Sequence, residues 1–240
     1  MQQHTILFTG GSGLLGGEVQ QLLPDAHYPS SADFNVTNYD QMQAFLVDKP
    51  IKLIVHAAAF TSPPMIDKDP KKAIDSNIIG TGNIVKLCME KQLRLIYIST
   101  DYVFDGSQGN YKEDAPVLPV NKYAWSKLGG ECAVKLHDNA LIIRTSFGPN
   151  EFPFPKAFVD QWTSRQSAKD IAEKVVKIAT QTDEHVTGIL HVGGPRRTVY
   201  EYAKSLDPTK EIGELSIQNM NFSVPKDTSL NCQRYEQLIK

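Results

Sequence analysis

Two side chains that could exchange a proton with a substrate stand four residues apart, Tyr123 and Lys127, in the run Tyr-Ala-Trp-Ser-Lys. Residues four apart share one face of an α-helix, so this spacing sets a phenol beside an ammonium group. A free tyrosine has a pKa of about 10, and a nearby cation lowers that pKa. The pair could therefore protonate a carbonyl oxygen during a reduction, although an exposed structural helix pair has the same spacing.

Hydroxyl side chains precede this pair at the end of a predicted strand. The segment Ile96–Gly106 reads I-Y-I-S-T-D-Y-V-F-D-G, and its apolar start predicts a strand that ends at Ser99 and Thr100. Open α/β sheets bind their ligands at the carboxyl ends of the strands. One of the two hydroxyls could therefore donate a hydrogen bond to the oxygen of a substrate.

A glycine loop follows the first predicted strand and precedes the first predicted helix. Gly10, Gly13 and Gly16 form the pattern G-x-x-G-x-x-G. Glycines let the backbone turn tightly and approach a pyrophosphate, and the following helix points its amides at that anion. A tight turn alone also needs glycines, but the strand before and the helix after are the context that the dinucleotide motif requires. The sequence therefore predicts a dinucleotide site.

The choice between NAD(H) and NADP(H) depends on the end of the second predicted strand. NAD-binding proteins usually have an acidic residue there, which binds the ribose hydroxyls. This chain has Ser30 and Ser31, with Asp33 slightly later and no arginine. Two hydroxyls without a carboxylate favour NADP(H) over NAD(H), although both serines could simply cap the turn.

The elements that must position these residues alternate along the chain. Apolar runs predict strands and 3.6-residue periodicity predicts helices. Strands are expected at 5–9, 26–28, 53–56, 93–98, 141–143 and 189–192, and helices at 14–23, 38–49, 70–91, 123–136, 168–180 and 198–206. Continuously apolar strands between helices are typical of an α/β fold, here a Rossmann-type doubly wound parallel sheet.

The segment after the fifth of these strands has a different character. Residues 147–158 hold three prolines among aromatic residues, which predicts irregular structure. We expect a dinucleotide-binding domain formed by residues 1–146 and 168–192. Residues 147–167 and 193–240 would then form a small C-terminal substrate-binding lobe.

Composition excludes several classes of function. The chain has 240 residues, a formal net charge of -2 and a pI of about 6.3, so no broad basic surface is available for nucleic acid. Three cysteines without a C-x-x-C pair argue against a disulfide framework, and no cluster has metal-ligand spacing. No apolar run reaches the length of a membrane span and no secretory leader is recognisable, so we expect a cytoplasmic protein without a bound metal.

Taken in order, these motifs resemble one protein family. His56–Thr61 reads H-A-A-A-F-T, and it is followed by the S-T-D-Y-V-F-D-G run, by Y-x-x-S-K and by Arg144-Thr145-Ser146. The sequence is similar to the extended short-chain dehydrogenases/reductases, and within them to the dTDP-4-dehydrorhamnose reductase branch. The likeness runs to about Ser146 and continues more loosely beyond it.

The resemblance implies a role for each matching residue. It implies that Thr100, Tyr123 and Lys127 are catalytic, and that Thr100 and Asp101 contact the substrate. Cofactor contacts implied by the resemblance or by the loop chemistry are Gly10, Ser12, Gly13, Leu14, Leu15, Gly16, Ser31, Asn35, Val36, Ala57, Ala58, Ala59, Asn77, Tyr123 and Lys127.

The activity implied is NAD(P)H-dependent reduction of a nucleotide-linked 4-keto-6-deoxy sugar, in a protein that could form a homodimer. Two alternatives stay open. One is a nucleotide-sugar epimerase or dehydratase on the same scaffold. The other is a non-catalytic, dinucleotide-binding regulatory subunit, such as the relative in this branch that regulates methionine adenosyltransferase.

Overall fold

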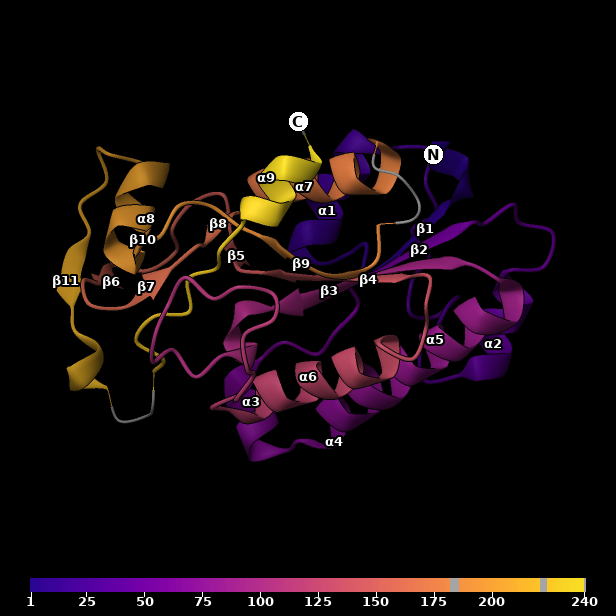
Figure 1. Ribbon diagram of the computed structural model, residues 1–240, viewed down its shortest axis with the longest axis horizontal. Helices are drawn as coiled ribbons and strands as arrows, with labels where there is room; N and C mark the ends of the chain where they lie inside the picture. The colour runs from indigo at the N-terminus through magenta and orange to yellow at the C-terminus, as the bar shows by residue number, and fades with distance from the viewer. Residues whose placement is uncertain (182–185, 221–223, 240) are drawn as a thin grey trace.

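A parallel sheet with helices on both faces forms the centre of the molecule (Figure 1). The computed structural model describes residues 1–181, 186–220 and 224–239, without the side chain of Pro63. The strand order is β1-β2-β3-β4-β9. These strands span Ile6–Thr9, Leu53–His56, Arg94–Thr100, Ala140–Thr145 and Gly188–Val192. Every residue of the first four is buried, as expected for a parallel sheet covered on both faces.

Two hydrophobic cores hold the helices against the sheet. On one face, α1 (Leu14–Leu22), α7 (Ala168–Gln181) and α9 (Gln233–Leu238) cover Ile6, Phe8 and their neighbours. On the other face, α2 (Tyr39–Phe45), α5 (Gly80–Lys91) and α6 (Lys122–Val134) cover Leu7 and Leu95. The Rossmann-type doubly wound fold predicted from the sequence is confirmed.

Two sequence-based expectations were wrong. The strand expected at 26–28 is reduced to one bridge, between His27 and Leu7 on the free side of β1, because Pro29 follows at once and lacks the amide hydrogen that a ladder needs. The helix expected to run to Lys49 ends at Phe45. The helix expected at 70–91 is confirmed as one continuous helical run, in which a π-helical turn (Ile74–Ile79) joins α4 (Lys71–Ala73) to α5.

The remaining elements build a lobe at one end of the sheet (Figure 1). Its small core joins Phe152, Ala157, Val199 and Tyr202. The segment expected to be irregular contains two short strands. The elements here are β5 (Phe147–Gly148), β6 (Lys156–Phe158), β7 (Trp162–Thr163), β8 (Gln166–Ser167), β10 (Arg197–Thr198), α8 (Val199–Leu206) and β11 (Gly213–Leu215). Helix α3 (Pro63–Lys68) lies apart from the lobe, below α6 in Figure 1. Three short 3-10 turns span Gln3–Thr5, Asp101–Val103 and Ile217–Asn219.

Candidate active site

A cleft of about 1310 Å³ runs along the carboxyl ends of the central strands. Most of the residues predicted from the sequence line this one cleft. They are Gly10, Ser12, Gly13, Leu14, Leu15, Gly16, Ser31, Asn35, Val36, Ala57, Ala58, Ala59, Thr100, Asp101 and Tyr123. Two predicted residues, Asn77 and Lys127, are buried and do not line it. The cleft exceeds the roughly 300–1,000 Å³ of ordinary small-ligand sites, so it has room for two ligands.

The glycine loop fits the pyrophosphate of a dinucleotide. Gly10 has φ of +79°, and a Cβ there would lie 2.8 Å from the amide nitrogen of Ala58. At Gly16 a Cβ would lie 2.3 Å from the carbonyl oxygen of Gly10, so the loop closes only around glycine. Gly13 caps α1 without a side chain, which leaves the first amides of the helix open to an anion.

Asn77 holds the wall of the cleft from behind. Its Oδ1 accepts from the amide of Phe60 at 2.7 Å, and its Nδ2 donates to the Phe60 carbonyl at 2.9 Å. The same Nδ2 donates to Ser126 Oγ of α6 at 2.8 Å. Asn77 therefore ties the loop after β2 to the helix that carries Tyr123, and the π-helical turn is what presents it.

The phenol and the strand-end hydroxyl meet at the cleft. Thr100 ends β3, and Tyr123 lies in the first turn of α6, which Asn121 caps by accepting from the amide of Ala124 at 2.8 Å. Burial, with the charge of Asp101, raises the pKa of Tyr123 well above 10, and a hydrogen bond from Thr100 partly opposes this. In the protein without ligand the phenol is therefore protonated, the form that a proton donor needs.

Lys127 lies under the cleft lining. Its Nζ is 4.1 Å from the centre of the Tyr97 ring, and burial lowers its pKa from 10.5 to about 7, while the charge of Glu131 raises that pKa. The sequence had suggested that Lys127 lowers the pKa of Tyr123. In this structure Lys127 is not among the groups that act on the phenol, whose pKa is raised by burial, so that suggestion was wrong for the protein without ligand.

A buried ion pair supports the helix behind Lys127. Glu131, fully buried on α6, accepts from Arg144 Nη2 at 2.7 Å and from Ser99 Oγ at 2.5 Å. Ser99 and Arg144 are register partners on β3 and β4, so the pair joins α6 to the middle of the sheet. Glu131 follows Lys127 by one helical turn, and the signal Y-x-x-x-K-x-x-x-E was visible in the sequence but was missed.

Asp101 connects the cleft to the C-terminal segment. It is buried, and its carboxylate accepts from Thr228 Oγ1 at 2.6 Å and from Thr100 Oγ1 at 3.2 Å. Burial raises the pKa of Asp101, and these hydroxyls and Arg165 oppose the rise. The cleft is also lined by Ser146, Phe147 and Arg165, which the sequence analysis did not select. Ser146 belongs to the R-T-S motif, which marked the end of a strand. No sequence pattern marked Phe147 or Arg165.

His56 is fully buried and hydrogen-bonded through both ring nitrogens. Its ring nitrogens contact Thr9 Oγ1 at 2.7 Å and Thr81 Oγ1 at 3.1 Å, and burial lowers its pKa to about 3.

Among the described residues no group of His, Cys, Asp and Glu side chains could hold a metal ion. Within that same part of the chain, none of the helices combines the length and the apolar character that crossing a membrane requires.

A glycine cradle beside a strand-end threonine and a buried phenol is the arrangement of Rossmann-type oxidoreductases that use NAD(P). This chain is of that class. Comparison with known proteins narrows the class: the model of the RmlD substrate binding domain matches residues 4–215, and the chain belongs to this family.

Individual relatives agree with the family. The chain is 26% identical over 275 residues to methionine adenosyltransferase 2 subunit beta of Rattus norvegicus, covering 97% of this chain and 82% of that protein. It is 28% identical over 221 residues to dTDP-4-keto-6-deoxy-D-glucose reductase of Streptomyces niveus, covering 82% and 76%. The structure of dTDP-4-dehydrorhamnose reductase from Bacillus anthracis str. Ames, in complex with NADP, superposes with a TM-score of 0.85 at 24% identity, covering 97% and 92%.

Proposed function

We propose that this protein reduces the keto group of a nucleotide-linked 4-keto-6-deoxy sugar, with NADPH as its preferred reductant. The observation that carries the proposal is that Thr100 and Tyr123 line the same cleft as the glycine loop, close enough for Thr100 to act on the phenol. The curated relative from Streptomyces niveus is a reductase of this substrate class.

The residues of the chain divide the work of such a reduction. The amides at the start of α1 would hold the pyrophosphate of the cofactor, and Ala57, Ala58 and Ala59 line the cleft that would receive it. When bound, reduced nicotinamide supplies the hydride. Tyr123 donates its proton to the carbonyl oxygen of the sugar. Thr100 donates a hydrogen bond to the same oxygen and keeps the carbonyl in line.

The family resemblance implies that Lys127 would bind the ribose of the cofactor, although its ammonium group lies over Tyr97 behind the cleft lining. Its charge would favour the phenolate that forms once Tyr123 has given up its proton. Thr100 donates to Asp101 in the protein without ligand, so its hydroxyl must turn from Asp101 to the sugar oxygen when the substrate binds.

The preference for NADPH rests on the adenosine end of the cleft. Ser30 and Ser31 line it, and no carboxylate of the described residues does. The nearby carboxylate of Asp33 is exposed and accepts from Ser30 Oγ at 2.6 Å. The hydroxyl of Ser30 is engaged by this carboxylate, so Ser31, which lines the cleft, is the hydroxyl that can donate to a 2'-phosphate. The solved reductase from Bacillus anthracis holds NADP.

A screen of nucleotide-sugar ketones tests the proposal. Each ketone is mixed with NADPH or NADH, and the loss of reduced-cofactor absorbance is followed. We expect turnover with a dTDP- or UDP-linked 4-keto-6-deoxy sugar, faster with NADPH. Tightly bound NAD without net cofactor turnover would instead indicate an epimerase or dehydratase, although the described cleft lining contains no His, Cys or Glu to serve as a second acid or base.

The likeness to methionine adenosyltransferase 2 subunit beta, over 97% of this chain, favours a second candidate, a regulatory subunit that binds a dinucleotide. Affinity purification from the native cell distinguishes the two functions. A stoichiometric partner enzyme, together with no turnover of any ketone in the screen, would support regulation over reduction.

A further inference from the structure

One cationic side chain faces the cleft from the side of the lobe. Arg165 lies between β7 and β8, is partly exposed, and is the only Lys or Arg among the described residues that line the cleft. It stands at the end of the cleft that holds Ser146, Phe147 and Asp101. A diphosphate that enters this end therefore meets one positive charge from the described part of the protein, and Arg165 carries it.

The guanidinium group of Arg165 has most of its hydrogen-bonding capacity free. Its Nε donates to Ser146 Oγ at 3.4 Å, and within the described ranges neither Nη group has a hydrogen bond or an ion pair. A guanidinium has five N–H donors in a planar fork, so two parallel donors are available to a ligand. Other arginines of the region differ, since Arg196 pairs with Asp227 at 2.8 Å and Arg144 pairs with Glu131.

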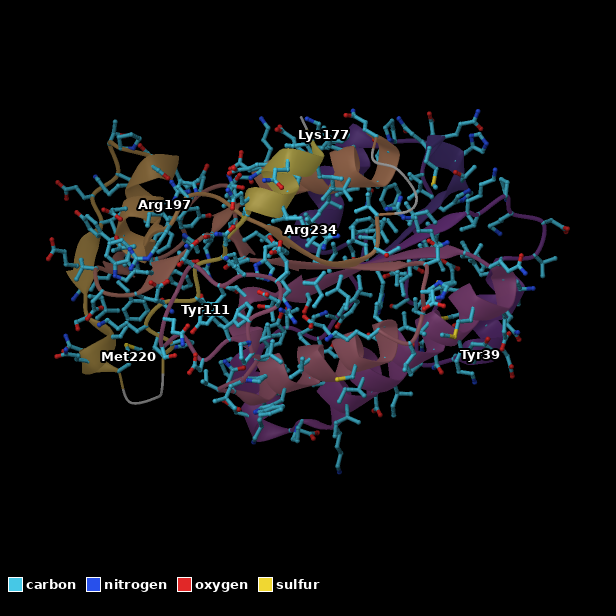
Figure 2. The ribbon with its side chains drawn as sticks, viewed as in Figure 1. Tyr39, Tyr111, Lys177, Arg197, Met220 and Arg234 are labelled. Atoms are coloured by element: carbon cyan, nitrogen blue, oxygen red, sulfur yellow. The ribbon has the colours of Figure 1, made fainter. Side chains whose placement is uncertain are left out.

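The lobe fixes the backbone from which Arg165 projects. The amide of Arg165 donates to Thr163 Oγ1 at 3.0 Å. Its carbonyl oxygen accepts from Nη2 of Arg197, which projects from β10 in the lobe, at 3.2 Å (Figure 2). The strands that flank Arg165 on either side are paired, β7 with β10 and β8 with β5. Anchoring on both sides reduces the entropy that the backbone loses when the side chain binds a ligand.

Arg165 lies in the same cleft as the reacting groups, Thr100 and Tyr123. Asp101 lines this cleft as well. The Nε of Arg165 donates to Ser146, the residue after the register partner of Thr100. In a 4-keto hexose the keto carbon and the anomeric carbon, which carries the diphosphate, are on opposite sides of the ring. A group that binds the diphosphate is therefore expected about one sugar ring away from Tyr123, on the side of Asp101.

We propose that Arg165 binds the diphosphate of the nucleotide-sugar substrate. The inference rests on the proposed function and adds the subsite that recognises the activated end of the sugar. The same charge also offsets the buried carboxylate of Asp101, which would otherwise repel the incoming diphosphate. The pyrophosphate of the cofactor is a second possible anion, but it has the open amides of α1 at the glycine loop.

Calorimetric titration of nucleoside diphosphates into the protein saturated with NADP⁺ tests the subsite. The probes are dTDP, UDP, GDP and CDP, each compared with its nucleoside. The variants are Arg165→Gln, Arg165→Lys and the control Lys169→Gln, which removes the same charge from an exposed position outside the cleft lining. Affinity of the free variants for NADPH is measured by fluorescence.

We expect Arg165→Gln to weaken the best-bound diphosphate about 10- to 100-fold, the loss of one charge-assisted bidentate contact. Arg165→Lys should recover part of this, because it keeps the charge and loses the fork. Binding of the nucleoside, binding of NADPH and the Lys169→Gln control should stay within about twofold of wild type.

Three results would overturn the proposal, each in a different way. Unchanged diphosphate affinity in Arg165→Gln would show that the subsite lies elsewhere while the proposed function stands. Loss of NADPH affinity in that variant would assign Arg165 to the cofactor. If the cofactor-loaded wild type binds none of the four diphosphates, the nucleotide-sugar function itself fails, and the subsite with it.

Discussion

Lys127 occupies an energetically costly position. The residue is 3% exposed, and its ammonium group has the Tyr97 ring 4.1 Å away, the neutral imidazole of His56 on β2, and Glu131 one turn along α6. Arg144 on β4 neutralises Glu131, which limits how far that carboxylate can compensate Lys127. A buried ammonium group without a full counter-charge lowers the stability of the folded protein, and proteins retain such groups where they act on a ligand.

This cost predicts how stability changes with pH. Because folding lowers the pKa of Lys127 from 10.5 to about 7, the unfolded chain holds the proton more tightly between these values. The free energy of unfolding therefore gains a rising contribution with pH across this window, and protonation near and below pH 7 opposes folding. Lys127→Met should raise that free energy at pH 7 by about 1–3 kcal/mol and flatten its rise toward pH 9.

Urea unfolding followed by circular dichroism between pH 6 and 9 measures this. Lys135→Met, an exposed change just after α6, is the control and should alter neither value. If Lys127→Met is less stable than wild type at pH 7, with an unchanged pH slope, the buried ammonium is stabilised by its surroundings and the description of this site is wrong.

At the scale of elements, two adjacent glycines near the start of α1, Gly16 and Gly17, lead to a prediction. In Gly16→Ala the new Cβ would lie 2.3 Å from the Gly10 carbonyl oxygen, so the loop must move. We expect NADPH to bind at least about tenfold more weakly and unfolding to cost about 1–3 kcal/mol less. Fluorescence titration and urea unfolding measure the two effects.

Gly17→Ala is the matched control for this loop. A Cβ at Gly17 has nothing within 4 Å, and the residue lies inside the same helix. Alanine there should leave NADPH affinity unchanged and stabilise the protein by about 0.5–1 kcal/mol, the difference in helix propensity. Equal effects of the two substitutions on NADPH binding would mean that close backbone approach does not shape the site.

The sequence predicted those helices and strands whose burial gives them a regular apolar pattern. Continuous apolar runs identified β1, β2, β3, β4 and β9 because each of these strands is largely buried. The π-helical turn at Ile74–Ile79 contains no glycine or proline, so periodicity alone could not find it. The family resemblance implied the cofactor contacts of Asn77 and Lys127, and a sequence pattern does not give the depth at which such residues are buried.

At the scale of the whole molecule, the end of the chain returns to the site. Thr228 donates to Asp101, and the amide of Asp227 donates to the Gly106 carbonyl at 3.0 Å, so the last segment supports the substrate end of the cleft. The sequence of this segment has no periodicity and indicated only a loop-rich lobe. The contact of Thr228 with Asp101 joins residues 127 positions apart, which no local pattern encodes.

Assembly is a further prediction at this scale. By analogy with extended short-chain dehydrogenases we expect a homodimer paired through helices beside the sheet. Exposed apolar side chains support this face, since Trp125 on α6 is 53% exposed and Ile79, in the π-helical turn that packs against α6, is 50% exposed. Light scattering at micromolar concentration should give about twice 26.7 kDa for wild type, and a single-chain mass for Trp125→Asp. A wild-type mass of 26.7 kDa would contradict the prediction.

The central claim is that Tyr123 gives the proton that completes reduction of a sugar ketone. Single-turnover oxidation of NADPH, with the ketone found in the screen, tests it in Tyr123→Phe. This change keeps the ring and removes the acid, so the chemical step should slow by roughly 10²–10⁴-fold while NADPH affinity stays near that of wild type. Turnover of Tyr123→Phe at the wild-type rate would show that Tyr123 is not the acid and that its pairing with Thr100 is only structural.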